Sequence, residues 1–143
     1  MVTTRPTPPG FVRARISSIA GYVPPRVLTN ADLEKMVDTS DEWIMKRVGI
    51  RERHVVDAGV ATSDLAKEAS LLAIRKAGLT PADIDFILVA TTTPDTFFPS
   101  TACVLQAKIG ASRAWGYDRV AACSGFTYAL TTASHIGSSG GGR

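Results

Sequence analysis

The sequence predicts an α/β protein, and three segments carry that prediction. Residues 86–92 are apolar throughout, which is typical of a parallel strand covered on both faces. Residues 115–122 end in a second small apolar run, and a helix is predicted between the two at residues 101–109. Two parallel strands joined by a helix form a βαβ unit, in which ligands bind beyond the carboxyl ends of the strands. We therefore expect a functional site after residue 92 or after residue 122.

Composition limits the class of protein. The 143 residues have the length of one ordinary domain, and 45% of them are hydrophobic. The net charge is only +3, with Lys and Arg scattered, so we expect no nucleic-acid partner. The longest apolar run is too short to span a bilayer, and the two cysteines lack metal-ligand spacing. These features predict a soluble, cytoplasmic protein without membrane, metal or cofactor.

Three regions are predicted along the chain. Residues 1–10 are rich in Pro and Thr without periodicity and are expected to form a disordered tail. Residues 11–136 are expected to fold, beginning with an alternating strand at residues 11–16. Residues 137–143 are mostly Gly and Ser and are expected to be a flexible end.

Two capping boxes predict consecutive short helices, one starting after Thr29 and one after Thr39. The second helix carries Trp43 and Arg47 at positions i and i+4, on one side of the helix. An indole that stacks on a base and a guanidinium that binds phosphate would together hold a nucleotide. The alternative is a buried tryptophan with a cation beside it.

The middle of the chain is predicted from turn and cap residues. A long helix is expected to start at residues 62–64 and to stop at Gly78, and a short helical turn is expected at Pro81. Residues 50–56 are expected to form a charged, partly exposed strand, in which His54 receives no catalytic role.

The loop at residues 91–100 contains two phenylalanines, Phe97 and Phe98. Phenylalanines in a loop either cover the edge of a core or line a pocket, and both alternatives stay open here. Ser100 is expected to cap the next helix, and Cys103 is expected on the buried side of that helix.

Cys123 follows the second apolar run directly, and a helical pattern begins at residue 127. This order places the cysteine where a strand turns into the N-terminus of a helix. The unpaired amides of a helix N-terminus carry a partial positive charge that stabilises a thiolate, the nucleophilic form of cysteine. The alternative is that Cys123 is a small buried core residue.

Five segments resemble β-ketoacyl-acyl carrier protein synthase III in sequence, in order and with the spacing of that family. They are residues 29–44, 49–54, 89–93, 98–100 and 121–130. The resemblance runs from about Ile16 to Leu130 and implies a thiolase-like α/β fold with layered α-β-α-β-α architecture. It further implies that this sequence holds only the N-terminal half of that fold, and that the full-length protein is a homodimer.

The resemblance also implies a reaction and the residues that perform it. An acyl group passes from coenzyme A, a substrate and not a cofactor, to Cys123, whose backbone amide helps to bind the oxyanion. Decarboxylative condensation with malonyl-acyl carrier protein then starts fatty acid synthesis. Trp43 is implied to stack on the adenine, with Thr39 beside the adenine and Arg47 on a phosphate. Phe98 is implied to close the acyl pocket of the neighbouring subunit.

One departure from the family pattern limits these expectations. The histidine and asparagine that complete the family's catalytic triad lie in its second half, and His54 and His135 do not occupy those positions. We therefore expect this chain to be inactive in condensation and at best weak in acyl transfer. We also expect it to expose an apolar face that makes it marginally stable or prone to aggregate. Two alternatives stay open: a starter-unit ketosynthase III of polyketide synthesis, and a non-catalytic fragment that binds coenzyme A or dimerises.

Overall fold

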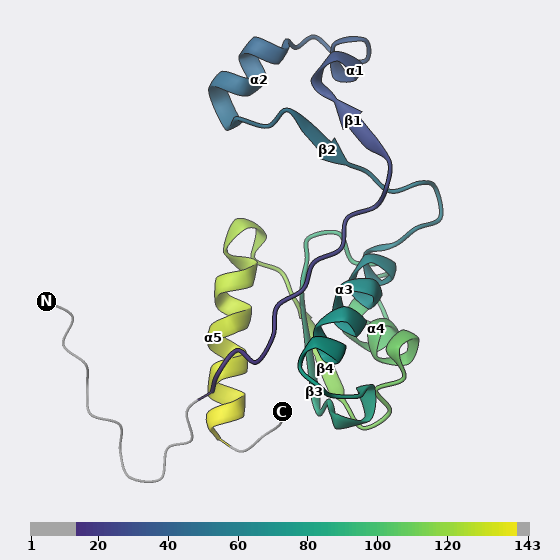
Figure 1. The fold of residues 1–143 in the computed structure, drawn as a ribbon, viewed down its shortest axis with the longest axis vertical. Coiled ribbons are helices and arrows are strands. Elements are labelled where there is room, and N and C mark those ends of the chain that lie inside the picture. Colours follow the sequence, from purple (N-terminus) through teal and green to yellow (C-terminus); the bar gives the residue numbers. More distant parts are fainter. Residues whose placement is uncertain (1–13, 140–143) are drawn as a thin grey trace, which may run out of the picture. The chain divides into compact units, whose positions relative to one another are not determined.

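The computed structural model describes residues 14–139, which divide into two compact units (Figure 1). One unit is Tyr22–Ala61, here called the hairpin unit. The other combines residues 14–21 with residues 62–139 and is here called the sheet unit. The tail expected at residues 1–10 and the last four residues of the expected flexible end lie outside the described residues.

In the hairpin unit, strand β1 (Val27–Thr29) pairs antiparallel with β2 (Glu52–His54), so that Leu28 lies opposite Arg53. Helices α1 (Asn30–Glu34) and α2 (Asp41–Val48) lie between the two strands in sequence. The charged strand expected at residues 50–56 is therefore confirmed in its central part.

The capping box predicted at Thr29 is confirmed. The Thr29 Oγ1 accepts a hydrogen bond from the Asp32 amide at 3.2 Å, and the Asp32 carboxylate accepts one from the Thr29 amide at 3.1 Å. The cap predicted at Thr39 is wrong by one residue, because Ser40 is the N-cap of α2 and its Oγ accepts from the Trp43 amide at 3.1 Å. The helix α2 ends at Gly49, whose φ of 70° is a left-handed conformation that favours glycine.

The cap of α1 makes one carboxylate sensitive to a single substitution. Hydrogen bonds from the Thr29 hydroxyl and amide, and more weakly the Lys35 ammonium, hold the pKa of Asp32 below its ordinary value of 3.8. Because the native pKa is lowered, this cap stabilises the fold above pH 3.8 and loses its effect as the pH falls through the native pKa.

We predict that Thr29→Val raises the pKa of Asp32 toward 3.8, since valine keeps the shape and loses the hydroxyl donor. The measurement is an NMR titration of the Asp32 carboxyl carbon. A Lys35→Met variant serves as the comparison and should give a smaller rise. An unchanged Asp32 titration in Thr29→Val would show that the hydroxyl does not set this pKa.

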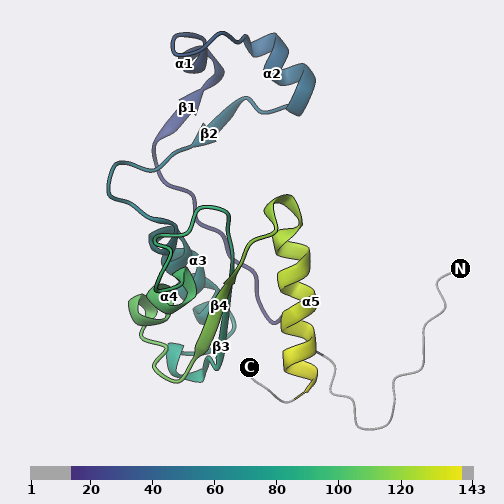
Figure 2. The same cartoon turned by 180° about the vertical axis from the view of Figure 1, so that it is seen from behind.

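The predicted βαβ unit is confirmed in the sheet unit. Strand β3 (Phe86–Ala90) pairs parallel with β4 (Trp115–Arg119), from Phe86 opposite Trp115 to Ala90 opposite Arg119. Helix α4 (Thr101–Ile109) connects them and lies with α3 (Thr62–Lys76) on one face of the strands. Helix α5 (Gly125–Ser138) covers the other face, as Figures 1 and 2 show from opposite sides.

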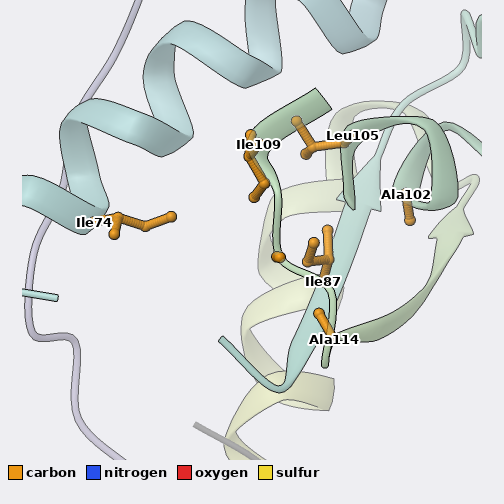
Figure 3. Close-up of a cluster of buried hydrophobic side chains, with 7 residues drawn as sticks. Ile74, Ile87, Ala102, Leu105, Ile109 and Ala114 are labelled. Carbon is orange, nitrogen blue, oxygen red and sulfur yellow. The ribbon is translucent and has the colours of Figure 1, made fainter. Parts of the chain in front are cut away.

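The core of the sheet unit lies between the strands and the α3–α4 layer (Figure 3). Leu105 is 4% exposed and packs with aliphatic side chains of α3, α4 and β3. The members of this core are Ile74, Ile87, Ala102, Leu105, Ile109, Ala111 and Ala114. Gly116 of β4 allows this strand to lie close to β3, because a Cβ at this position would be only 2.2 Å from the Ile87 carbonyl oxygen.

Several predicted boundaries are wrong. The described part of the strand expected at residues 11–16 is not a strand, and the segment 14–21 instead meets α3 through isolated bonds, such as Ser18 Oγ to the Ala73 carbonyl at 2.7 Å. Strand β4 ends at Arg119 and not at residue 122. Helix α5 continues to Ser138, two residues beyond the expected limit of the folded region.

Apolar side chains are exposed on the side of the sheet unit formed by the end of β4 and by α5. Leu130 is 42% exposed, and Val120 and Phe126 are exposed to a greater extent. These exposed side chains agree with the apolar face expected from the sequence. Marginal stability and aggregation remain predictions.

Candidate functional site

Cys123 lies in the turn that joins β4 to α5. A short 3-10 turn, η2 (Ala122–Ser124), follows the strand, and α5 begins at Gly125. Ala122 has a φ of 42°, a left-handed conformation that is unusual for a residue with a side chain and is often found at functional sites. The predicted strand-to-helix turn is therefore present, with Cys123 two residues before the helix.

The start of α5 packs closely on the sheet. Gly125 is buried, and a Cβ at this position would lie 3.3 Å from the Ala90 Cβ at the end of β3. The preceding residue, Ser124, makes no side-chain cap of the helix. The partial positive charge of the first amides of α5 is therefore not offset by a capping oxygen from Ser124.

The Cys123 side chain is exposed. The alternative that it is a buried core residue is therefore wrong. An exposed thiol at the N-terminal end of a fourteen-residue helix is accessible to a substrate.

Arg119, at the end of β4, is a residue near this turn that the sequence did not single out. Its guanidinium carbon lies 5.1 Å from the ring centroid of Tyr128 on α5, a cation–π contact between strand and helix. Among the described residues its buried Nε has no hydrogen-bond partner. A charged residue immediately before the small apolar run 120–122 is the signal that could have identified it.

Trp43 and Arg47 lie together on α2, as their spacing predicts. The Arg47 guanidinium carbon is 5.3 Å from the centroid of the indole ring, and Trp43 is 56% exposed. The alternative of a buried tryptophan is therefore wrong. An exposed indole with a permanent positive charge beside it can stack on a base and attract a phosphate.

An open pocket of about 370 Å³ lies beside this indole. Asp38, Thr39, Ser40 and Trp43 line it. Thr39, which does not cap α2, therefore lines the same pocket as Trp43. The hairpin unit thus brings Thr39, Trp43 and Arg47 into one region on its own.

Phe98 is 87% exposed, and its neighbour Phe97 is also exposed. The alternative that these rings cover the edge of the core is wrong for this chain. The loop that presents them is anchored on both sides: Thr62 Oγ1 donates to the Thr93 carbonyl at 2.6 Å, and the Asp95 amide donates to Thr101 Oγ1 at 3.2 Å.

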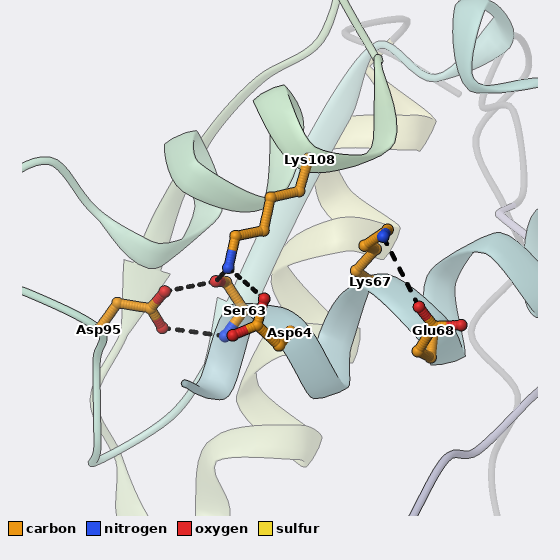
Figure 4. A network of polar contacts seen from close by, with 6 residues as sticks. All are labelled: Ser63, Asp64, Lys67, Glu68, Asp95 and Lys108. Atoms are coloured by element: carbon orange, nitrogen blue, oxygen red, sulfur yellow. Dashed lines mark hydrogen bonds and ion pairs between the residues drawn. The ribbon is translucent and has the colours of Figure 1, made fainter. Parts of the chain in front are cut away.

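A polar network fixes the same loop to α3 and α4 (Figure 4). Ser63, fully buried, donates through its amide to Asp95 Oδ1 at 2.9 Å and through its hydroxyl to Asp95 Oδ2. Lys108 of α4 donates to the Ser63 hydroxyl at 2.7 Å and forms an ion pair with Asp64. These contacts hold in place the loop that carries Phe97 and Phe98.

The prediction that Cys103 lies in the core is wrong, because this side chain is exposed. Helix α4 buries Ala102, Leu105 and Ile109 instead, so that Cys103 is turned away from the core. Ser100 caps the helix as predicted, and its hydroxyl donates to the Cys103 sulfur at 3.2 Å.

The two histidines lie in different units of the chain. The His54 Nδ1 lies 2.6 Å from the Pro24 carbonyl oxygen, within the hairpin unit, and His135 lies in the last turn of α5. Within residues 14–139 no cluster of three or more His, Cys, Asp or Glu side chains is arranged to bind a metal ion. None of the helices in this range combines the length and the hydropathy needed to cross a membrane.

Known proteins resemble the chain in sequence. No protein-family model matches it. β-Ketoacyl-[acyl-carrier-protein] synthase III of Solibacter usitatus is 56% identical over 124 residues, which is 87% of this chain and 38% of that protein. The synthase III of Koribacter versatilis is 54% identical over 128 residues, 90% of this chain and 38% of that protein.

Solved structures resemble it in fold. The 3-oxoacyl-[acyl-carrier-protein] synthase III of Aquifex aeolicus matches with a TM-score of 0.84 and 46% identity, over 90% of this chain and 41% of that one. The priming β-ketosynthase of the R1128 polyketide pathway matches with a TM-score of 0.88 and 33% identity. This match covers 94% of this chain and 40% of that one. The chain spans about two fifths of the length of these relatives. It therefore matches the N-terminal part of β-ketoacyl-[acyl-carrier-protein] synthase III and has part of that family's thiolase-like α/β fold.

Proposed function

We propose that this chain contains the acyl-accepting site of a condensing enzyme of the synthase III type, with Cys123 as the nucleophile. The observation that carries the proposal is the exposed thiol of Cys123 in a strained turn at the N-terminus of α5. The matching relatives are named as synthases of β-ketoacyl-[acyl-carrier-protein], which agrees with an acyl-transfer role for such a thiol.

The proposed step is a thioester exchange. The Cys123 thiolate attacks the carbonyl carbon of an acyl-coenzyme A, a new carbon–sulfur bond forms, and the oxygen carries the negative charge of the tetrahedral intermediate. The bond to the coenzyme sulfur then breaks, and coenzyme A leaves as the thiol after taking up a proton. Backbone amides around Cys123 and at the start of α5 are the groups that would stabilise the oxyanion.

The coenzyme would be bound through its nucleotide. Trp43 supplies a stacking surface for the adenine, Thr39 borders the same pocket, and Arg47 supplies the charge for a phosphate. Coenzyme A is a substrate in this scheme, and the proposal includes no cofactor or metal. A cytoplasmic location follows as part of the proposal, since acyl-coenzyme A is the substrate.

In the complete reaction, malonyl-acyl carrier protein would be decarboxylated and condensed with the acyl group on Cys123. We propose that this chain does not perform that step by itself. His135 is ten residues beyond the first residue of α5, roughly 15 Å along the helix axis, and His54 contacts a backbone carbonyl in the hairpin unit. A homodimer, in which Phe98 closes the acyl pocket of the partner, is part of the proposal for the longer protein.

A starter-unit ketosynthase of polyketide synthesis is the second candidate. The fold match to the R1128 priming β-ketosynthase, with a TM-score of 0.88, is the observation that favours it. Both candidates share the acylation of Cys123, and they differ in the carrier protein that receives the product.

The experiment that tests the proposal is incubation of the purified chain with acetyl-coenzyme A. Intact-mass spectrometry should show the addition of one acetyl group, and a thiol assay should show one equivalent of released coenzyme A. A chain shown by circular dichroism to be folded, with neither adduct nor release, would refute the proposal.

The nucleotide site gives a separate prediction. Trp43→Ala should weaken coenzyme A binding by about 5-fold to 160-fold, because stacking of a base on an aromatic ring contributes about 1–3 kcal/mol. Isothermal titration calorimetry measures the affinity directly. Trp115→Phe changes the other tryptophan, which lies in the sheet unit against Phe86, and should leave the affinity unchanged. Equal losses in both variants would argue against an adenine site at Trp43.

A further inference from the structure

We infer that Asn30 is a positioning residue for the nucleotide-binding side of α2, and that it acts through Asp41. The inference rests on the proposed function, in which Trp43 and Arg47 of α2 bind the nucleotide. Asn30 itself does not line the pocket beside Trp43, and its effect on binding would come through the placement of the helix.

The Asn30 side chain is 2% exposed and bonded at both polar atoms. Its Nδ2 donates to Asp41 Oδ1 at 2.7 Å and to the Ile50 carbonyl at 2.9 Å. Its Oδ1 accepts from Arg53 Nη2 at 2.7 Å. Only this orientation of the amide is satisfactory, because the opposite one would set an oxygen against two acceptors and a nitrogen against a donor.

These bonds hold both ends of α2. Asp41 is the first residue of the helix, and Ile50 lies two residues after its last residue. One amide nitrogen therefore joins the start and the end of an eight-residue helix to the β1–α1 junction. The Asp41 amide is fixed separately by the Glu34 carboxylate at 2.7 Å.

Apolar packing does little to orient α2. Ile44 is the one buried residue among those that form the helix, and Trp43 is largely exposed. An eight-residue helix is also too short to be stable alone. The direction of Trp43 and Arg47 therefore depends on the polar anchor, which is buried at Asn30 and directional because each of its hydrogen bonds needs a specific donor and acceptor.

The arrangement can be broken and rebuilt with two isosteric changes. Asn30→Asp replaces the donor nitrogen by an oxygen that faces the Asp41 carboxylate and the Ile50 carbonyl. Adding Asp41→Asn restores a donor–acceptor pair between the two positions and the native net charge, while the Ile50 carbonyl still faces an oxygen. Arg53 keeps an acceptor in both variants.

The experiment measures coenzyme A affinity by calorimetry and Cys123 acylation as a function of acetyl-coenzyme A concentration. Asn30→Asp should weaken affinity at least tenfold, raise the half-saturating concentration by a similar factor, and leave the rate at saturation within threefold. The double variant should recover part of the lost affinity, because the bond to position 41 is restored and the bond to the Ile50 carbonyl is not. Asp57→Asn, which removes a surface ion pair of the same unit, is the matched control and should change nothing.

Each result decides the inference. Native affinity in a folded Asn30→Asp variant, or no recovery in a folded double variant, would overturn it. If Asn30→Asp does not fold, Asp41→Ala takes its place: it keeps the Asn30 bonds to Ile50 and Arg53 and should still weaken affinity. Native affinity in that variant would also overturn the inference. The proposed function fails separately, when the native chain binds no coenzyme A or Trp43→Ala binds it normally, and the inference then falls with it.

Discussion

Native chain incubated with acetyl-coenzyme A is expected to gain one acetyl group, and the Cys123→Ser variant is expected to gain none. Serine keeps the size of the side chain, but a hydroxyl is a much weaker nucleophile toward a thioester than a thiol is, unless a general base activates it. We expect the rate of adduct formation to fall at least 100-fold. Intact-mass spectrometry over a time course measures it.

The chain offers a matched control for this experiment. Cys103 is also an exposed free thiol, and it lies at the third position of α4, near the N-terminus of a helix. Cys103→Ser should therefore acylate like the native chain if the turn before α5 is what activates the thiol. An adduct that persists in Cys123→Ser and disappears in Cys103→Ser would place the nucleophile on α4.

The largest expected effect on stability is at Leu105. This side chain lies at the centre of the core between α4 and the strands, so Leu105→Ala removes buried methyl groups and leaves a cavity. Substitutions of this kind cost about 2–5 kcal/mol in free energy of unfolding. Urea denaturation followed by circular dichroism measures the loss for the sheet unit.

Leu130→Ala is the control, since the same atoms are removed from a residue that is 42% exposed on α5. It should change the free energy of unfolding by no more than about 0.5 kcal/mol. Equal losses at the two positions would mean that α5 is covered in solution, for example by another molecule. A small loss at Leu105 would contradict the core described above.

Local sequence signals predicted the elements that local interactions decide. The capping box at Thr29, the glycine stop at Gly49 and the apolar strand at residues 86–90 all depend on neighbours close in sequence or on a simple pattern. The cap of α2 could not be assigned as securely, because Thr39 and Ser40 are adjacent hydroxyl residues. The cap is Ser40, and the next amide, that of Asp41, donates to the carboxylate of Glu34. Because Glu34 belongs to another helix, α1, this contact could not be read from the sequence around the cap.

The errors arose where a longer-range contact decides the outcome. Cys103 follows a buried alanine, and only the packing of α4 shows that the helix buries Ala102 and Leu105 and turns the cysteine outward. Residues 14–16 have strand-like alternation, but a strand also needs a partner for its backbone. At the candidate site, helical spacing was sufficient to predict that Trp43 and Arg47 lie together. The anchoring role of Asn30 could not be predicted in this way, because it depends on contacts with residues 11 and 23 positions away.

The hairpin unit has a consequence for how such chains can be rearranged. It interrupts the sheet unit at a single place, between residue 21 and residue 62, and its two connecting segments run side by side through the pairing of β1 and β2. The Val55 amide also donates to the Arg26 carbonyl at 3.0 Å beyond the end of the strands, so the segments that lead into and out of the hairpin lie side by side at residues 26 and 55. A segment whose two ends lie close together can be exchanged for another segment without distorting the unit into which it is inserted. The residues proposed to bind the nucleotide therefore lie in a unit that recombination could replace while the turn around Cys123 stays intact.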